Sequence, residues 1–266
     1  MTTTLAIANQ KGGVAKTTSV ASIGAALAEL GQKVLLVDLD PQACLTFSLG
    51  IDPEDLELSV HHVLTKGLDA DEVVIATEDG VDLLPATIEL ARAEADLLTR
   101  TGREQALKAA LEPILDSYDW VLLDCPPSLG VLTVAALTAA DGVLIPLQCE
   151  TLSHRGVGQL LDTVHDVRRF TNRSLEVWGV LPTLYDGRTN HARTVLETIS
   201  DTYDLEVVEP PIPKTIKFAE APAAGRSILR TSRSSKGAKA YRDVAANLVT
   251  RSRRPVPKAA RKSGNR

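Results

Sequence analysis

The fold of this chain is decided by the stretch Asn9-Gln10-Lys11-Gly12-Gly13-Val14-Ala15-Lys16-Thr17-Thr18. An apolar run over residues 5–8 leads into this stretch, and a helix-forming run over residues 19–30 follows it. In a strand–loop–helix unit of this kind, the backbone N–H groups of the loop surround an oxyanion, and the N-terminus of the helix adds partial positive charge. The stretch therefore predicts a phosphate-binding loop, in which Lys16 reaches the β- and γ-phosphates and Thr17 offers its hydroxyl to Mg²⁺.

The loop departs from the standard pattern G-x-x-x-x-G-K-[ST] at two positions. The first glycine of the pattern would fall at Gln10 and the second at Ala15. Because so loose a match is common by chance, the prediction also depends on the flanking strand and helix. If the backbone at Ala15 needs a positive φ, its Cβ costs on the order of 1 kcal/mol, which nucleotide binding would tolerate.

Apolar segments alternate with segments of helical spacing along the chain. Further strands are expected at residues 33–37, 81–85, 120–123, 142–147, 175–181 and 205–208, and helices at 60–64, 70–75, 88–98, 104–116, 131–140, 153–170, 191–203 and 235–249. Residues 209–234 show little periodicity and predict irregular structure. Aromatic residues make up only 3% of the chain, so Ala, Val and Leu must build the core. The pattern predicts an α/β fold, a mostly parallel twisted sheet with helices on both faces.

The cysteines and the N-terminus exclude several classes of protein. The three cysteines are widely separated and form no C-x-x-C pair, which argues against a zinc site or a disulfide framework. The N-terminus resembles no secretory signal, and no apolar run reaches the roughly 18 residues of a membrane span. We therefore expect a reduced, cytoplasmic setting.

Charge is divided unevenly along the chain. Residues 214–266 contain 15 Lys/Arg and two acids, a net charge of +13, whereas residues 1–213 contain 14 Lys/Arg and 32 acids, a net charge of −18. The last segment, 251–266, holds seven Lys/Arg and no acid, so we expect one domain over 1–250 followed by a disordered basic tail over 251–266. A basic part on an acidic body suggests a polyanionic partner, although a solubilising tail beside a solvated helix face is the other interpretation.

Carboxylates follow several of the expected strands. Four motifs end strands, namely the phosphate loop, Asp38–Gln42, Asp124–Pro127 and Leu147–Glu150. Ligands of an open parallel sheet bind at the carboxyl ends of its strands. Asp124 is placed like a Walker B carboxylate that holds Mg²⁺ directly or through water, although it could also simply cap the next loop. Asp40 could orient or deprotonate an attacking water, and Asp38 could contact the shell of the metal.

Together these motifs resemble the ParA/MinD ATPases. Residues 11–18 look like the deviant Walker A motif, usually K-G-G-V-G-K-T-T, and depart from it at Ala15. Residues 38–42 resemble the switch motif of the family, and residues 123–128 its Walker B segment. Residues 182–189 and 220–222 are similar to the short ParA (Soj-type) chromosome-partition branch. The resemblance covers residues 4–250.

This resemblance implies a P-loop NTPase that hydrolyses ATP to ADP and phosphate, slowly and with Mg²⁺, as an ATP-dependent sandwich homodimer. Lys11 would be the signature lysine that reaches the nucleotide of the partner, where its charge acts as an arginine finger does elsewhere. Catalysis would use Lys11, Lys16 and Asp40, and Mg²⁺ would be held by Thr17, Asp38 and Asp124. ATP would bind to Lys11, Gly12, Gly13, Val14, Ala15, Lys16, Thr17 and Thr18 together with Pro213.

The resemblance also implies that the ATP-bound dimer binds DNA non-specifically and is released when a ParB-like protein stimulates hydrolysis. Such a protein would be cytoplasmic and nucleoid-associated, and would segregate a chromosome or plasmid or position another cargo. The basic C-terminal part agrees independently, because Lys and Arg contacts to phosphates give salt-dependent affinity without sequence choice. Arg188 and Lys217 match basic positions of the family, and charge alone adds Lys214, Arg226, Arg230, Arg233, Lys236, Lys239 and Arg242.

Three alternatives compete with this interpretation. A MinD-like membrane ATPase would need a C-terminal amphipathic helix, but Pro255 and Pro257 interrupt the tail, and we expect no membrane insertion. An iron–sulfur reductase would need cysteines at a dimer axis, and the positions of Cys125 and Cys149 do not suggest a cluster. A non-enzymatic DNA-binding module would not need the intact Lys16, Thr17, Asp40 and Asp124.

Overall fold

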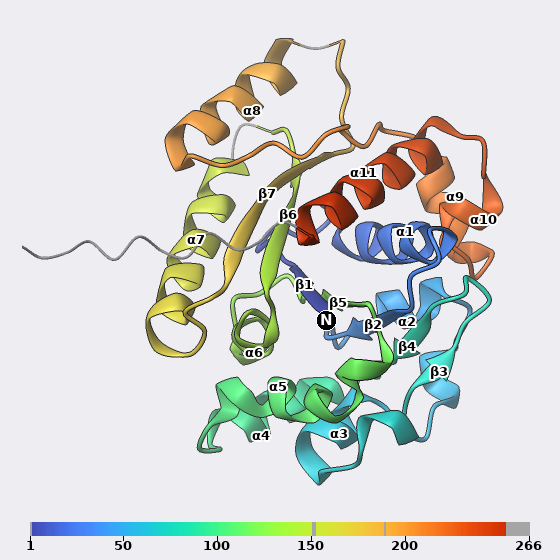
Figure 1. Cartoon of the computed structure of the whole chain (residues 1–266), viewed down its shortest axis with the longest axis vertical. Helices are drawn as coiled ribbons and strands as arrows, with labels where there is room; N and C mark the ends of the chain where they lie inside the picture. The colour runs from blue at the N-terminus through green and yellow to red at the C-terminus, as the bar shows by residue number, and fades with distance from the viewer. Residues whose placement is uncertain (1, 151–152, 189, 254–266) are drawn as a thin grey trace, which may run out of the picture.

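The structure is a computed structural model that describes residues 2–150, 153–188 and 190–253. At its centre lies a seven-stranded sheet with the strand order β3-β4-β2-β5-β1-β6-β7 (Figure 1). The strands are β1 (Thr3–Ile7), β2 (Val34–Asp38), β3 (Ile75–Ala76), β4 (Asp82–Leu84), β5 (Trp120–Asp124), β6 (Gly142–Gln148) and β7 (Glu176–Thr183). Neighbouring strands pair in parallel, except that β3 runs antiparallel to β4. The prediction of a mostly parallel α/β sheet is confirmed.

Helices follow most of the strands. They are α1 (Lys16–Glu29), α2 (Cys44–Ser48), α3 (Val60–Lys66), α4 (Leu90–Leu98), α5 (Ala106–Leu111), α6 (Val131–Ala139), α7 (Ser153–Phe170), α8 (Asn190–Tyr203), α9 (Lys217–Ala223), α10 (Ile228–Thr231) and α11 (Lys236–Ser252). Short 3₁₀ segments are η1 (Pro53–Asp55), η2 (Ala70–Glu72), η3 (Arg103–Gln105) and η4 (Glu112–Ser117).

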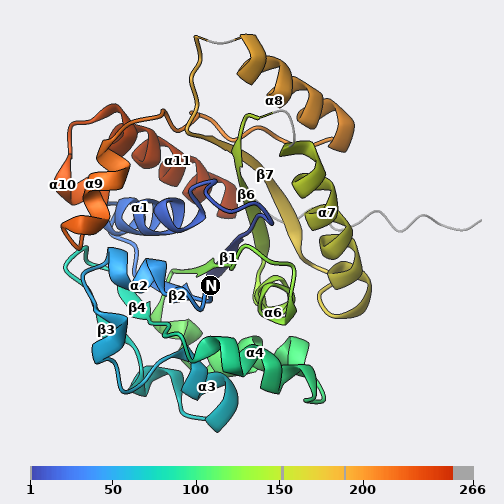
Figure 2. The same cartoon turned by 180° about the vertical axis from the view of Figure 1, so that it is seen from behind.

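The sheet separates two apolar cores, because alternate residues of a strand face opposite sides. In β2, Leu35 and Val37 belong to the core that α3 to α8 cover, whereas Val34 and Leu36 belong to the core that α1, α2 and α9 to α11 cover. Figures 1 and 2 show α1 and α11 side by side on the second face, with α4 and α5 away from them on the first. Ala, Val and Leu supply most of both cores, as the scarcity of aromatic residues predicts.

Three segments differ from the expectation. Residues 70–75, expected as a helix, form only the three-residue 3₁₀ segment η2, and Ile75 begins β3. Residues 205–208, expected as a strand, form only an isolated bridge between Val207 and Val180. Residues 209–234, expected to be irregular, contain α9 and α10, which have seven and four residues. Helices this short do not repeat their apolar positions often enough to show a period in the sequence, and α9 also contains Pro222. Both helices are stabilised by tertiary packing against the core beside α1 and α11.

The strand register brings the carboxylate motifs together. Asp124, the last residue of β5, lies beside Asp38 of β2 on one side and beside Ile7 of β1 on the other. Because these strands are parallel, their carboxyl ends meet at one edge of the sheet, and the loop after Ile7 begins there. The phosphate loop and the two aspartates therefore converge on one place.

The last helix extends slightly beyond the expected domain. Helix α11 ends at Ser252, and the Arg251 guanidinium donates to the Trp178 carbonyl at 2.8 Å and to the Glu206 carboxylate at 2.8 Å. Arg251 is thus part of the folded body, whereas residues 254–266 of the expected tail lie outside the described residues. In the described part of the chain, none of the helices combines the length and apolar character needed to cross a bilayer.

Candidate nucleotide-binding site

The loop between β1 and α1 has the backbone shape of an anion cradle. Gly13 has φ 73°, and Ala15, which precedes the first residue of α1, has φ 64° and ψ 35°. Both residues are therefore left-handed, the conformation that glycine tolerates best. No side chain caps the N-terminus of α1, and its first turn holds no acidic residue. The N–H groups and positive dipole end of α1 are thus available to an anion.

Hydrogen bonds to neighbouring strands hold this loop in place. The Asn9 amide donates to the Pro146 carbonyl of β6 at 2.7 Å, and its side-chain oxygen accepts from the Lys11 N–H at 3.0 Å. The Thr183 hydroxyl of β7 donates to the Val14 carbonyl at 2.9 Å. The loop is consequently shaped before any ligand binds, which lowers the entropy cost of binding.

Lys16 reaches back across the loop. Its ammonium donates to the Lys11 carbonyl at 3.1 Å, and the residue is buried. Burial lowers the pKa of Lys16, while the nearby Asp124 opposes that shift. A lysine held in this way presents its charge inside the loop, where solvent screens it less than at the surface.

Asp38 is committed to the turn that follows β2. Its carboxylate accepts from the Thr46 N–H at 2.9 Å, from the Thr46 hydroxyl at 2.8 Å and from the Asp40 N–H at 3.1 Å. Burial raises the pKa of Asp38 to about 6. These bonds position Asp40 and the start of α2.

Asp124 is arranged differently from Asp38. It is 1% exposed, and neither carboxylate oxygen has a hydrogen bond of ordinary geometry among the described residues. Burial raises the pKa of Asp124, and the charge of Asp38 raises it further, while the Thr17 hydroxyl and Lys16 lower it. The absence of a bond to the following loop, within the residues described, argues against a simple capping role.

A buried carboxylate beside the Thr17 hydroxyl, without a hydrogen bond of ordinary geometry among the described residues, fits Mg²⁺. This ion keeps several waters and usually takes one or two carboxylates together with the phosphates of its nucleotide. Across residues 2–150, 153–188 and 190–253, no cluster of three or more Asp, Glu, His or Cys could enclose a metal by itself. The donor set therefore suits a nucleotide-bound ion, with Thr17 and Asp124 as the protein ligands.

A cavity of about 1120 Å³ opens over the loop. Its floor includes Gly12, Gly13, Ala15, Lys16, Thr17 and Thr18, and Asp40 lies on one side of it. Residues that the sequence does not single out form much of the remaining wall, among them Phe47, Ile212, Thr215, Phe218 and Tyr241. Pro213 lies between Ile212 and Thr215 in the sequence and forms an isolated parallel β-bridge with Tyr185.

Lys11 and Val14 line a second, smaller cavity of about 490 Å³, together with Asn9, Gln10, Pro127, Leu147 and Gly156. The Lys11 ammonium forms an ion pair with the Glu150 carboxylate, in the loop after β6. Lys11 is thus engaged at this second cavity, whereas Lys16 lines the first.

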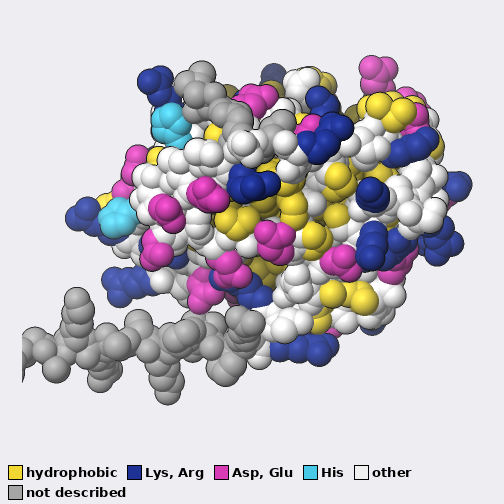
Figure 3. Space-filling view, turned by 90° about the horizontal axis from the view of Figure 1, so that it is seen from above, with side chains coloured by type: hydrophobic (Ala, Val, Ile, Leu, Met, Phe, Trp, Pro, Cys, Tyr) yellow, Lys and Arg dark blue, Asp and Glu magenta, His cyan; other side chains and the backbone are white. Residues whose placement is uncertain are grey.

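The face above the strand ends carries exposed apolar side chains. Figure 3 views the molecule from the side toward which β6 and β7 run, and apolar side chains gather there in a hollow ringed by charged ones. At the cavity, Phe47 and Ile88 are 55% and 67% exposed, and Ile216 beside it is 72% exposed. Exposed apolar groups that surround a pocket mark an interaction surface.

The basic residues of the C-terminal part divide into two groups. Most of those named from the sequence form ion pairs: Arg188 with Asp186, Lys217 with Glu220, Arg226 with Glu78, Arg230 with Asp79 and Arg242 with Glu29. Lys214, Arg233, Lys236 and Lys239 are exposed and form no ion pair within the described residues. The second group offers the cations that a polyanion could reach without breaking an existing pair.

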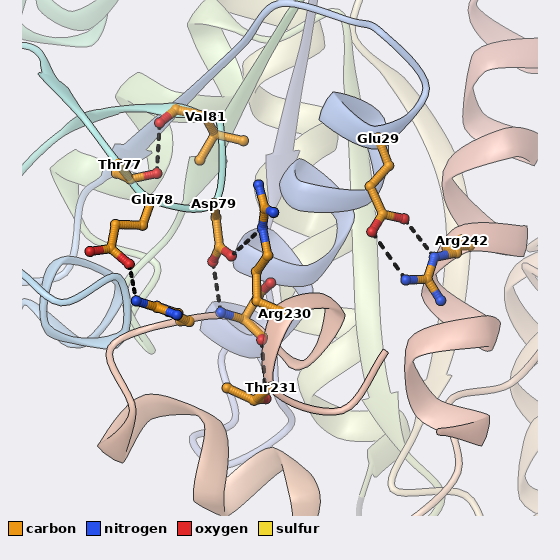
Figure 4. A network of polar contacts seen from close by, with 10 residues as sticks. Glu29, Thr77, Glu78, Asp79, Val81, Arg230, Thr231 and Arg242 are labelled. Atoms are coloured by element: carbon orange, nitrogen blue, oxygen red, sulfur yellow. Dashed lines mark hydrogen bonds and ion pairs between the residues drawn. The ribbon is translucent and has the colours of Figure 1, made fainter. Parts of the chain in front are cut away.

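Asp79 anchors the segment that carries several of these arginines (Figure 4). It is 3% exposed, accepts from the Ser227 N–H at 2.7 Å, and lies 3.6 Å from the Arg230 guanidinium. Burial raises the pKa of Asp79, whereas Ser227 and Arg230 lower it. Ser227 precedes α10, so this buried carboxylate fixes α10 to the turn between β3 and β4.

This chain is similar to known proteins over most of its length. A family model described as an AAA domain matches residues 2–177. The sporulation initiation inhibitor protein Soj of Bacillus subtilis is 44% identical over 246 residues, which cover 92% of this chain and 97% of Soj. The chromosome partitioning protein ParA of Caulobacter vibrioides is 39% identical over 259 residues, which cover 96% of this chain and 97% of that protein.

A solved structure is also similar over nearly the whole chain. It is described as cobyrinic acid a,c-diamide synthase from Mycobacterium smegmatis with a bound ATP analogue and magnesium. It is 56% identical, covers 94% of this chain and 95% of its own, and superposes with a TM-score of 0.85. The motifs in the loop, the strand order and these similarities agree. The chain therefore belongs to the ParA/MinD family of ATPases with a deviant Walker A motif, and within it to the branch of Soj and ParA.

Proposed function

We propose that this chain is a ParA-type partition ATPase, cytoplasmic and nucleoid-associated. ATP binding drives a sandwich homodimer, the dimer binds DNA without sequence preference, and slow hydrolysis, stimulated by a ParB-like partner, releases it. One observation carries the proposal: in a chain 44% identical to Soj, Lys16 and Thr17 lie beside a buried carboxylate, Asp124, whose oxygens make no hydrogen bond of ordinary geometry among the described residues.

The residues of the loop perform the binding and the charge stabilisation. The N–H groups of the loop and of the first turn of α1 bind phosphate oxygens, and Lys16 adds a buried positive charge. Thr17 and Asp124 would hold Mg²⁺, which would supply positive charge to the phosphate oxygens. Asp40, positioned by the bond from its N–H to Asp38, orients the attacking water at the edge of the cavity.

Dimerisation completes the site. Lys11 lies at the second cavity and not at the one over its own phosphate loop, and we assign it to the nucleotide of a partner. The exposed side chains of Phe47, Ile88 and Ile216 provide apolar area that a second copy would cover. A lysine supplied by the partner makes hydrolysis depend on the dimer, as an arginine finger supplied in trans does.

The DNA surface rests mainly on the cations that form no ion pair in the described part of the chain, Lys214, Arg233, Lys236 and Lys239. Arg188 and Lys217 contribute if DNA phosphates displace Asp186 and Glu220, which are exposed carboxylates. Contacts of this kind read phosphates and not bases, so affinity should depend on salt and not on sequence.

The description of the Mycobacterium smegmatis structure raises a second candidate, ATP-dependent amide synthesis. An enzyme that releases ammonia from glutamine needs a nucleophilic thiolate. Burial raises the pKa of the Cys44 and Cys125 thiols and raises that of Cys149 to about 11, so all three are protonated at neutral pH. Cys125 is also 1% exposed, which suits neither a thiolate nor an iron–sulfur cluster shared at a dimer axis.

The MinD-like alternative, a membrane-surface ATPase, is less favoured. Relatives that cover almost the whole chain at 37–44% identity include Soj and the chromosome partitioning protein ParA. The tail that would have to contact a membrane lies outside the described residues.

ATP turnover distinguishes these functions. A partition ATPase should release phosphate slowly with Mg²⁺ and ATP, and faster when DNA and a ParB-like protein are added. An amide synthase should release phosphate only with a carboxylic acid substrate and glutamine or ammonia, and should be indifferent to DNA. A membrane ATPase should respond to anionic vesicles in place of DNA.

A further inference from the structure

The ion pair between Lys11 and Glu150 joins two parts of the chain that are 139 residues apart. Lys11 belongs to the phosphate loop, and Glu150 belongs to the loop after β6. Their side chains are 37% and 52% exposed, so the pair lies at the surface, on the face where the strands end. The mechanism proposed above uses Lys11 but assigns no role to Glu150.

Hydrogen bonds fix the backbone at Lys11, so its side chain can move without the loop. The Lys11 N–H donates to Asn9, and its carbonyl accepts from Lys16. Asn9 in turn donates to Pro146 of β6, the strand that leads to Glu150. Lys11 can therefore leave Glu150 by rotating its side chain, while the loop keeps its shape.

We propose that Glu150 holds Lys11 within its own chain until a second copy of this chain presents ATP. The inference rests on the proposed function, in which Lys11 acts on the nucleotide of the partner. Glu150 offers Lys11 one negative charge, whereas the triphosphate and its transferring phosphoryl group offer more. The lysine therefore exchanges Glu150 for the partner's ATP, and Glu150 opposes dimerisation when ATP is absent. Glu150 is a positioning residue in this account.

The strength of the ion pair between Lys11 and Glu150 follows from the exposure of its side chains. Ion pairs between exposed side chains shift an equilibrium by roughly 1.4- to 5-fold. Two lysines leave their carboxylates in each dimer, so removal of the hold should tighten dimerisation by about 2- to 30-fold. Because the pair is exposed, salt should weaken its effect.

The first test measures Lys11 directly in the nucleotide-free chain. Wild type and Glu150→Gln are treated briefly with acetic anhydride, and the modification of each lysine is followed by mass spectrometry, with the exposed Lys66 as internal reference. The ratio of Lys11 to Lys66 modification should rise by about 1.4- to 5-fold in Glu150→Gln. Glu104→Gln, which removes the partly exposed pair of Glu104 with Arg103, is the control and should leave the ratio unchanged. An unchanged ratio in Glu150→Gln overturns the proposal.

The second test measures dimerisation by sedimentation velocity with Mg²⁺ and ATP, without DNA. Glu150→Gln should dimerise at about 2- to 30-fold lower protein concentration than wild type. The difference should shrink in about 0.5 M KCl, because salt screens exposed charges. Equal or weaker dimerisation of Glu150→Gln beside a dimeric wild type overturns the hold alone. A wild type that stays monomeric with ATP overturns the proposed function together with the hold.

Discussion

Replacing Ala15 by glycine should raise the free energy of unfolding of the nucleotide-free protein. Ala15 has φ 64° and ψ 35°, in the left-handed region. A residue with a Cβ pays roughly 1–2 kcal/mol there. Glycine removes that strain but gives the unfolded chain more freedom, which returns about 0.5–1 kcal/mol. The net gain should be about 0.5–1 kcal/mol, or about 1–4 °C in Tm for a domain of this size.

Urea denaturation of wild type and variant, without nucleotide, measures this gain. The matched control is Ala246→Gly, at an exposed position in the middle of α11, where glycine should lower the free energy of unfolding by about 1 kcal/mol. The two glycine variants should thus move in opposite directions. If Ala15→Gly lowered stability as much as Ala246→Gly, the claim that this loop is strained at Ala15 would be refuted.

Three further changes test other parts of the account. Asp124→Ala should lower the Mg²⁺-dependent affinity for a fluorescent ATP analogue by about 10–100-fold. It should not lower the stability of the nucleotide-free chain, since the wild-type carboxylate is buried without a hydrogen bond of ordinary geometry among the described residues. Equal affinity with Mg²⁺ and with EDTA in wild type would contradict this prediction. Burial raises the pKa of Asp79, so the folded chain binds the proton of its carboxyl group more tightly than the unfolded chain does. The contribution of Asp79 to stability is therefore lost as the pH rises from about 4 through the folded pKa. The free energy of unfolding in urea, measured across this pH range, should depend less on pH in Asp79→Asn than in wild type; an equal pH dependence would refute the assignment. Lys236→Ala should weaken DNA binding equally on unrelated sequences and reduce the slope of log affinity against log salt concentration by about 0.9. Arg242→Ala, which breaks the pair with Glu29, should act mainly on stability. A larger loss of DNA affinity in Arg242→Ala than in Lys236→Ala would count against the proposed surface.

The elements of the sheet could be predicted because each strand is a continuous apolar run and each long helix repeats its apolar positions. The phosphate loop could be predicted from its local sequence, and parallel pairing then placed Asp38 and Asp124 at the same edge. The short helices α9 and α10 could not be predicted, because tertiary packing stabilises them and they are too short for their apolar residues to show a helical period.

The parts of the site that sequence could not predict depend on contacts between distant residues. The Asp38 carboxylate accepts hydrogen bonds from Thr46 and from the turn at Asp40, and no pattern in the sequence marks those bonds. Basic residues were counted together, yet Arg226 and Arg230 pair with acids nearly 150 residues away in the chain, between β3 and β4. Charge composition predicts a polyanion partner, but only the folded structure shows which cations remain available to it.

The central claim is that ATP produces a dimer and that the dimer binds DNA. Sedimentation velocity with fluorescently labelled DNA duplexes of two unrelated sequences tests it in a single measurement, with Mg²⁺ and either ATP or ADP. The account predicts that with ATP the chain sediments as a dimer and binds both duplexes equally, with an affinity that falls as salt rises, and that with ADP it is a monomer that binds weakly. Equal DNA binding with ATP and ADP, or a monomer that binds DNA in the presence of ATP, would contradict it.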